Sequence, residues 1–222
     1  MATKSQQTDT RPSLSRDRIL AAAVALIDRE GLDALSMRRL GAELGVGAMA
    51  LYNYFPNKDA LREGVTEALL AEIDLSAGQN DDWAEAISGL ARSFREVLLA
   101  HPNAFPLIES KPAVTPDAFR PIELSFAVLA RAGFDPKTAL QAHWAIVGYI
   151  IGHVSFQVNN PLHQPGHRQE EIAIRRANLP FEQFPRVFEV LPYMAHQSFD
   201  DAFDFGLKAL IQGLEDELEA RL

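Results

Sequence analysis

The strongest constraint on the fold is a helical period of apolar residues that recurs along most of the chain. In the segment 16–30, apolar side chains occupy the i, i+3, i+4, i+7 and i+8 positions of one helix face: Ile19, Ala22, Ala23, Leu26 and Ile27. Ser15 can cap the start of this helix, and Gly31 stands where a left-handed C-cap is expected. The alternation of polar and apolar residues that is typical of strands is nearly absent. The chain is therefore predicted to be all-α.

Residues that cap and end helices predict further helices along the chain. Ser36, Asn57 and Thr115 stand where N-caps are expected, and Gly45 and Gly133 stand where helices end. Together with the apolar period, these positions predict helices over about 37–43, 48–54, 57–75, 83–100, 116–131, 135–158 and 198–218.

The remaining segments divide the chain into a small N-terminal unit and a larger helical bundle. Residues 1–14 are polar and are expected to form a disordered tail, 15–62 a compact three-helix unit, and 63–222 the bundle. Within the bundle, 101–115 is rich in proline and is expected to be irregular. The segment 159–195 contains five prolines and is expected to be a loop with short helices.

The absence of cysteine excludes several classes of function. Disulfides, cysteine zinc sites, iron–sulfur clusters and thiol catalysis all need this residue. The longest apolar runs are far shorter than the roughly 18 residues that a membrane span requires. The first 15 residues also lack the apolar stretch of a secretory signal. We therefore expect a cytoplasmic protein that has no membrane partner.

The histidines do not have the spacing of metal ligands. His143 and His153 are ten residues apart on one predicted helix, so they do not share a face. His163 and His167 are four apart, but a Pro-Gly pair between them prevents the helix that would align them. No metal ion and no cofactor are expected.

The charge of the chain is distributed unevenly. The net charge of −9 argues against a nucleic-acid partner when the chain is taken as a whole. Residues 1–62, however, hold nine basic and seven acidic residues, whereas residues 63–222 hold 12 basic and 23 acidic residues. The N-terminal unit is thus slightly positive and remains compatible with DNA binding.

The segment 36–61 has the most informative pattern. Its two short predicted helices are joined by a tight Gly45-Val46-Gly47 connection, and such a pair at a steep angle forms a helix-turn-helix. Residues expected to face the helix over 16–30 are Leu40, Leu44, Val46 and Leu51. Residues suited to the DNA major groove are Ala48, Met49, Tyr52 and Asn53. Residues suited to phosphate contacts are Arg38, Tyr52, Tyr54 and Lys58. A plain pair of packed helices remains the alternative.

This region resembles the DNA-binding domain of the TetR family of bacterial transcriptional regulators. The matching features are the apolar stripe of 16–30, Ser36, Leu44-Gly45-Val46, Leu51-Tyr52, Phe55 and Asn57-Lys58. By position, the resemblance implies DNA contacts at Met37, Arg38, Ala48, Met49, Tyr52, Asn53, Tyr54 and Lys58. Gly47 and Ala48 stand where many relatives have a polar pair, so few hydrogen bonds to base edges are available there.

The resemblance extends to the effector domain of tetracycline repressors. The matching features include Trp83, Phe94, Gly133-Phe134 and the closing stretch 202–218. It implies a dimer interface made by two helices of each subunit, and small residues spaced three or four apart fit that role. These residues are Gly148, Gly152, Ala202, Gly206, Ala209 and Gly213. Packing within one chain is the alternative.

The expected ligand pocket departs from the tetracycline pattern. The magnesium-binding histidine and glutamate of those relatives fall near Leu107 and on Phe156, which lack the donor atoms that a hard cation requires. Polar drug contacts fall on Asp74, Leu90 and Ser125. We therefore expect no tetracycline–magnesium recognition and a mostly apolar pocket for a lipophilic molecule. Its expected residues are Phe94, Phe105, Leu107, Ile108, Ser125, Phe126, His143, Trp144, Val147, Ile151 and Phe156, although each could instead belong to the core.

These observations predict a ligand-responsive transcriptional regulator. The expected form is a homodimeric repressor that binds a palindromic DNA operator and is released by a lipophilic small molecule. One alternative is a helical small-molecule sensor that does not bind DNA. A second alternative is an enzyme, but the sequence contains no GxSxG, no glycine-rich phosphate loop and no HExxH.

Overall fold

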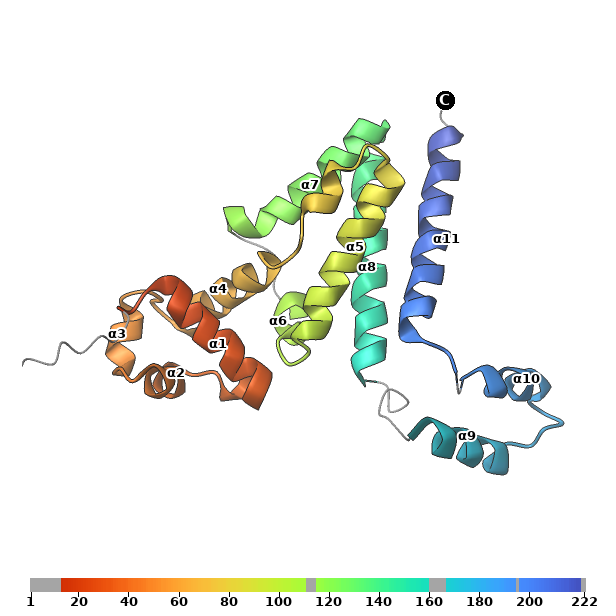
Figure 1. Cartoon of the computed structure of the whole chain (residues 1–222), viewed down its shortest axis with the longest axis horizontal. Helices are drawn as coiled ribbons and strands as arrows, with labels where there is room; N and C mark the ends of the chain where they lie inside the picture. Colours follow the sequence, from red (N-terminus) through yellow and green to blue (C-terminus); the bar gives the residue numbers. More distant parts are fainter. Residues whose placement is uncertain (1–12, 111–114, 160–166, 195, 221–222) are drawn as a thin grey trace, which may run out of the picture.

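The computed structural model describes residues 13–110, 115–159, 167–194 and 196–220, and the long regular elements in these ranges are α-helices (Figure 1). Two 3₁₀ turns, η1 (Leu32–Ala34) and η2 (Ser76–Gln79), lie between them. The helices are α1 (Arg16–Glu30), α2 (Met37–Leu44), α3 (Ala48–Tyr52), α4 (Lys58–Leu70), α5 (Trp83–Ala100), α6 (Phe105–Ser110), α7 (Pro116–Ala132), α8 (Pro136–Asn159), α9 (His167–Asn178), α10 (Pro185–Met194) and α11 (Phe199–Glu219). The all-α prediction is confirmed.

The predicted caps form at the helix starts. Each cap leaves its own backbone extended and accepts a hydrogen bond from an otherwise unpaired N–H of the first turn. The donor–acceptor pairs are Arg18 N to Ser15 Oγ at 3.2 Å, Arg39 N to Ser36 Oγ at 3.2 Å and Ala60 N to Asn57 Oδ1 at 2.8 Å.

The N-terminal helices α1–α3 and the first turns of α4 share one apolar core. Leu40, Leu51 and Phe55 are completely buried in it. The turn between α2 and α3 is tight, because a Cβ atom on Gly41 would lie 2.9 Å from the carbonyl oxygen of Val46. Glycine at this position therefore allows the two helices to approach each other.

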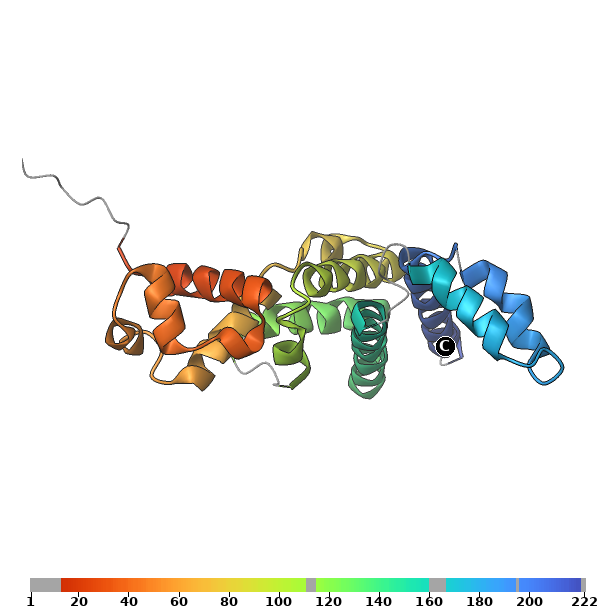
Figure 2. The same cartoon turned by 90° about the horizontal axis from the view of Figure 1, so that it is seen from below.

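The C-terminal helices form a second core and leave one hairpin outside it. Helices α5, α7, α8 and α11 bury a continuous apolar cluster. Arg95 of α5 links this helix to α8 and α11, since its Nη2 donates to Gln157 of α8 at 2.8 Å and to Asp200 of α11 at 2.6 Å. Helices α9 and α10 pack mainly on each other and project away from the bundle in both views (Figures 1 and 2).

The structure differs from the predicted boundaries mainly after α4. This helix ends at Leu70 rather than near Leu75, because the chain turns toward α5. There the backbone N–H of Asp74 donates to Oγ of Ser93 at 2.7 Å, and the Asp74 carboxylate accepts from the hydroxyl of Ser76 at 2.9 Å. In addition, α6 lies inside the segment that was expected to be irregular. In the described ranges, no helix is long and apolar enough to cross a membrane.

Candidate DNA-binding surface and ligand cavity

Helix α3 presents an exposed face at the end of the molecule that lies farthest from α9 and α10 (Figure 1). Met49 is 77% exposed, Tyr52 and Asn53 are also exposed, and Ala48 is half-buried. Leu51 points the other way and is completely buried. One face of this short helix therefore belongs to the core, and the opposite face is open to a partner.

Three predicted DNA contacts lie in other surroundings. The side chain of Met37 is only 6% exposed, because it packs in the same apolar cluster as Leu40. The hydroxyl of Tyr54 donates to the backbone carbonyl of Leu14 at 2.7 Å, which fixes this ring against the start of the chain. Lys58 is half-buried at the start of α4. Met37 thus supports α2 from inside and presents almost no surface to a ligand.

The consecutive arginines of α2 have different surroundings. Arg39 donates to Glu30 of α1 through Nη2 at 2.6 Å and Nε at 3.2 Å, and these hydrogen bonds lower the pKa of the Glu30 carboxyl. Arg29 joins the same group by pairing with Glu43 at 3.2 Å. Arg38, by contrast, is exposed and makes no hydrogen bond or ion pair with another described residue. Arg39 braces α2 on α1, whereas Arg38 remains available to an anion.

A cavity of about 230 Å³ lies among α4, α5, α7 and α8. Among the described residues, no charged side chain lines it, and the polar side chains that do are those of Thr66, Ser125 and His143. The lining residues are Thr66, Leu70, Ile73, Ile87, Leu90, Ala91, Phe94, Ile108, Ala118, Pro121, Ile122, Ser125, His143, Ile146, Val147, Ile150 and Ile151. Such a cavity suits an uncharged, mostly apolar molecule.

The polar groups of the cavity lie close together. The hydroxyl of Ser125 on α7 is 3.1 Å from Nδ1 of His143 on α8, and the ring of Phe126 packs against the imidazole with the ring centres 4.9 Å apart. Burial lowers the pKa of His143 and so favours the neutral form of the ring. The hydroxyl of Thr66 donates to the carbonyl of Arg62 within α4. The Ser125–His143 pair is thus the polar feature that a ligand would meet.

The structure brings six of the predicted pocket residues to the cavity: Phe94, Ile108, Ser125, His143, Val147 and Ile151. The other five lie elsewhere. Phe105 and Leu107 are buried in the two cores, Phe126 lies behind His143, and Trp144 and Phe156 are exposed. On α8 the helical period places Trp144 and Phe156 away from the cavity, which His143, Val147 and Ile151 line. One residue along a helix turns the side chain by about 100°.

Sequence reasoning missed the lining residues of α4 and most of those of α5. On α5 the signal was present, since Ile87, Leu90, Ala91 and Phe94 follow the i, i+3, i+4, i+7 spacing of one face. Leu90 lines the cavity at the position where the resemblance put a polar drug contact. On α4 the same spacing could not distinguish the cavity side from the core side, because the helix is apolar on both.

The outer face of α8 is a stripe of four residues, each four positions from the next. Trp144, Gly148, Gly152 and Phe156 are all exposed, and nothing lies within 4 Å of a Cβ atom built on either glycine. Trp144 is 66% exposed. Large aromatic side chains therefore lie at both ends of an exposed stripe whose two central positions carry no side chain.

Helix α11 has a similar exposed row, of Phe205, Ala209 and Gly213. Phe205 is 79% exposed, and a Cβ atom on Gly213 would have open space around it. Two other small residues of α11 lie against Tyr149 of α8: its hydroxyl donates to the backbone carbonyl of Ala202 at 3.2 Å and would collide with a Cβ atom on Gly206. The predicted small-residue stripe of α11 thus has one part packed on α8 of the same chain and one part open.

An exposed helix-turn-helix and an uncharged cavity in one helical chain define the class of DNA-binding regulators that respond to small molecules. Residues 19–65 match the family model described as bacterial regulatory proteins of the tetR family. Residues 76–218 match the model described as the tetracyclin repressor-like C-terminal domain. The chain belongs to the TetR family of bacterial transcriptional regulators.

The curated relatives are regulators of the same kind. The HTH-type transcriptional repressor DrrR1 of Streptomyces coeruleorubidus is 32% identical over 222 residues, which cover 92% of this chain and 78% of that protein. Tetracycline repressor protein class G of Vibrio anguillarum is 32% identical over 208 residues, which cover 91% and 94%. For an HTH-type transcriptional regulator of Saccharopolyspora erythraea, 37% identical over 150 residues, the match covers 64% of that protein's length.

Solved structures confirm the architecture. Apo ActR from Streptomyces coelicolor matches with a TM-score of 0.82 at 26% identity, covering 94% of this chain and 98% of that one. The complex of ActR with actinorhodin matches with a TM-score of 0.80 at the same identity, covering 93% and 99%. The ligand-bound relatives indicate that the shared function is ligand-responsive, DNA-binding regulation of transcription.

Proposed function

We propose that the protein is a homodimeric repressor that binds a palindromic operator and is released by an uncharged, lipophilic small molecule. In this proposal, residues 15–62 bind DNA and residues 63–222 bind the effector and dimerise. The observation that carries the proposal is the position of α4. Its Leu61 and Val65 pack in the core of the helix-turn-helix, while its Thr66 and Leu70 line the cavity. A ligand that moves α4 would therefore also move α3, the helix proposed to read the DNA bases (the recognition helix).

The proposed DNA contacts use the open face of α2 and α3. Met49 and Ala48 would pack on base edges in the major groove, Asn53 would offer hydrogen bonds there, and Tyr52 and Arg38 would contact phosphates. The exposure of Met49 and the absence of an intrachain partner for Arg38 among the described residues support these roles. Lys58 remains a phosphate contact in the proposal.

The proposed dimer uses the outer rows of α8 and α11. Gly148 and Gly152 would allow the backbone of a second copy to approach closely, and Trp144 and Phe205 would pack around that contact. Ala209 and Gly213 extend the row on α11. Two-fold symmetry of this kind places two recognition helices on one face of a duplex, which is the reason for expecting a palindromic operator.

The proposed effector is neutral and has one polar group that can hydrogen-bond near Ser125 and His143. An ionised ligand would find no partner for its charge among the described lining residues, none of which is charged. A wholly apolar ligand would leave the Ser125–His143 pair unused. A phenol, a ketone or an ester on an aromatic or aliphatic frame meets both conditions.

Selection of random DNA duplexes by the purified protein tests the DNA-binding part. Enrichment of a palindrome bound by one dimer is expected, and a folded dimer that enriches no sequence at low salt would refute the proposal. The selected duplex then serves to screen neutral aromatic compounds for release.

Two variants test whether release depends on the cavity. Phe94→Ala and Ser125→Ala should weaken release by an active compound and leave operator affinity nearly unchanged, because both side chains line the cavity. Phe119→Ala is the matched control, since this aromatic residue of α7 lies exposed outside the cavity. Equal loss of release in all three variants would place the effector elsewhere.

A further inference from the structure

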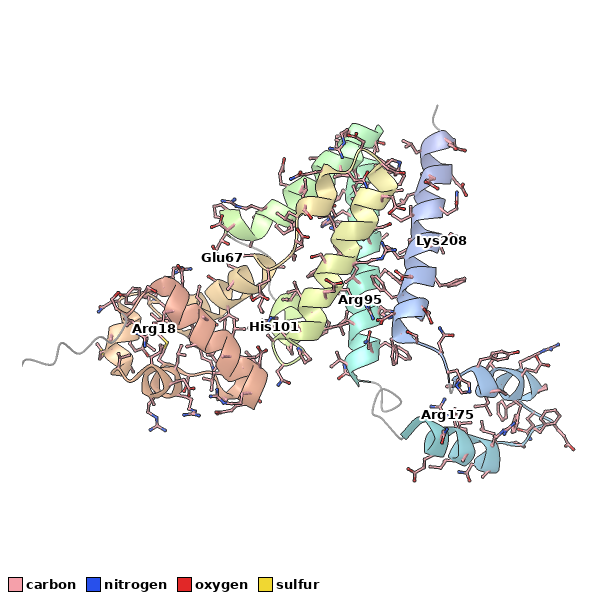
Figure 3. All side chains as sticks on the ribbon, in the orientation of Figure 1. Arg18, Glu67, Arg95, His101, Arg175 and Lys208 are labelled. Atoms are coloured by element: carbon pink, nitrogen blue, oxygen red, sulfur yellow. The ribbon has the colours of Figure 1, made fainter. Side chains whose placement is uncertain are left out.

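His101 joins three helical segments at the boundary between the two halves of the molecule. It caps the end of α5 that faces the N-terminal helices (Figure 3). Its Nδ1 lies 2.8 Å from Oδ2 of Asp28 on α1, and its Nε2 lies 3.0 Å from Oε2 of Glu72 in the turn after α4. The side chain of His101 is only 14% exposed. The ring is thus held between two carboxylates that come from different helical segments.

This arrangement specifies the protonation state of the ring. An ionised carboxylate only accepts hydrogen bonds, so each ring nitrogen must donate, and an imidazole donates from both nitrogens only when it is protonated. A neutral ring would leave one nitrogen lone pair facing a carboxylate oxygen. The geometry at His101 therefore requires the imidazolium, which makes both contacts charge-assisted.

The electrostatics of the surroundings agree with the geometry. Burial lowers the pKa of His101, but the hydrogen bonds and charges of Glu72 and Asp28 together outweigh burial, so that the net pKa is raised. Among the described residues, the charged groups that act on the ring are these two carboxylates. Asp28 comes from α1, and Glu72 comes from the turn after α4. From the α6 side, Leu107 adds apolar packing in the same core as α1.

The contact of His101 with Asp28 and Glu72 is called the joint below. Neighbouring contacts extend the joint and make it depend on His101. The side-chain amide of Asn103 donates to the backbone carbonyl of Asp28 at 2.9 Å, which holds the segment after α5 on α1. The second carboxylate oxygen of Asp28 is buried without any hydrogen-bond partner. The interaction with His101 is therefore the main stabilisation of this half-buried carboxylate, and its loss would leave the carboxylate unpaired between the two halves.

The joint lies close to the cavity along two helical segments. His101 is seven residues, about two turns, beyond Phe94 on α5, and Glu72 is next to Ile73. Phe94 and Ile73 both line the cavity. A displacement of either segment would change the distance between the ring and at least one of the two carboxylates.

We propose that protonated His101 is a positioning residue that fixes the orientation of the DNA-binding helices on the effector domain and makes this orientation sensitive to pH. The proposal rests on the proposed function for its regulatory meaning, whereas the joint itself can be tested without DNA. A histidine with a raised pKa in the folded protein stabilises the joint at low pH, and this contribution is lost as the pH rises through the folded-state value. The DNA-binding helices should therefore sample a narrow range of orientations at low pH and a broader range at high pH.

The first test is a titration of the ring. In full-length protein with ¹⁵N-labelled histidine, both His101 nitrogens should still carry protons above pH 6.5, the ordinary histidine value. Glu72→Gln should lower the pKa of His101, because it removes one of the two carboxylates that raise this pKa and leaves the pair with Asp28. A ring that titrates at or below the ordinary value would overturn the proposal.

The second test measures orientation. The chain has no cysteine, so spin labels at Asp33→Cys in η1 and Lys137→Cys in α8, both exposed, report one distance when labelled protein is diluted with unlabelled protein. The distance distribution should be narrow at about pH 6 and broaden by about pH 8.5. In His101→Gln the distribution should be broad at both pH values, because glutamine is uncharged and has a single donor nitrogen in place of the two on opposite sides of the imidazolium. His196→Gln, at an exposed loop position, is the matched control.

Operator binding gives the functional readout. The orientation fixed at low pH pre-organises the two recognition helices for the operator. Between about pH 6 and pH 8.5, operator affinity should therefore fall more in the native protein than in His101→Gln. The expected difference between the two falls is about fivefold, the low end of typical coupling. Identical distance distributions in the native protein and His101→Gln would overturn the proposal even if operator binding is normal. Failure to select an operator would refute the proposed function and leave the two DNA-free tests valid.

Discussion

The N-terminal helices and the outer surface of α8 and α11 differ in where they place large apolar side chains. In the first region, Leu40, Leu51 and Phe55 are completely buried within one chain. In the second, Trp144 and Phe205 are mostly exposed. Exposed aromatic residues in rows mark protein contact surfaces, whereas a closed core does not need a partner. The comparison separates a helix-turn-helix whose core closes within one chain from a bundle surface that the proposed dimer would cover.

Truncation in the closed core should have the largest effect on stability. Phe55→Ala should lower the free energy of unfolding by about 3–5 kcal/mol, because it removes a fully buried ring from a packed core. Urea unfolding followed by circular dichroism measures this change. Met49→Ala in the same region is the control and should stay within about 0.5 kcal/mol, since its side chain is exposed. Similar losses in both variants would contradict the division between core face and open face.

Breaking the open surface should instead change assembly. Gly148→Glu places a charge on the bare stripe of α8 without a clash in its own chain, so the protein should fold as a monomer. Operator affinity should then fall by about 100-fold or more, because the two recognition helices are no longer linked. Analytical ultracentrifugation and a binding titration measure the two effects. Ala127→Glu on the exposed side of α7 is the control, and a dimeric Gly148→Glu would contradict the proposed interface.

The two arginines of α2 sharpen the comparison inside the N-terminal region. Arg38→Ala should weaken operator binding and reduce the dependence of log affinity on log salt by about one, the effect of losing one phosphate contact. Arg39→Ala removes the pairing with Glu30 and should leave the salt dependence unchanged. Titrations at several salt concentrations measure both slopes. Equal slopes for the two variants would show that Arg38 is not a phosphate contact.

The smallest effect concerns reading of the bases. Where Met49 packs on a thymine methyl group, uracil in place of thymine should cost about 0.8 kcal/mol for the buried methyl. Met49→Ala should bind both duplexes with nearly equal affinity. Competition between the two duplexes measures this difference. A native protein that does not distinguish them would indicate that bases are read by hydrogen bonds, with Asn53 as the nearest candidate.

Local signals made much of the fold predictable. Ser15, Ser36 and Asn57 cap helices where expected, because an N-cap needs only its own side chain and the next turn. The end of α4 was placed about five residues too late, because the hydrogen bond from Asp74 to Ser93 depends on a helix that comes later in the chain. Boundaries set by tertiary contacts leave little trace in local sequence.

The candidate site was predictable only in part. The resemblance predicts Phe156 in the cavity because it aligns with the metal-binding glutamate of tetracycline repressors, yet Phe156 and Trp144 share the four-residue spacing of Gly148 and Gly152. Following that spacing would have placed all four on one exposed stripe. The role of His101 had no local signal, since its partners Asp28 and Glu72 are 73 and 29 residues away in sequence.

The hairpin of α9 and α10 has a consequence for how the stability of the protein is measured. It packs mainly on itself and exposes Phe181, Phe184 and Tyr193. If a second copy covers these rings, part of the free energy of folding comes from association, and mass action then makes the melting temperature rise with protein concentration. The hairpin amides would also exchange with solvent faster on dilution than those of the helix-turn-helix. A melting temperature would therefore have to be stated together with the protein concentration at which it is measured.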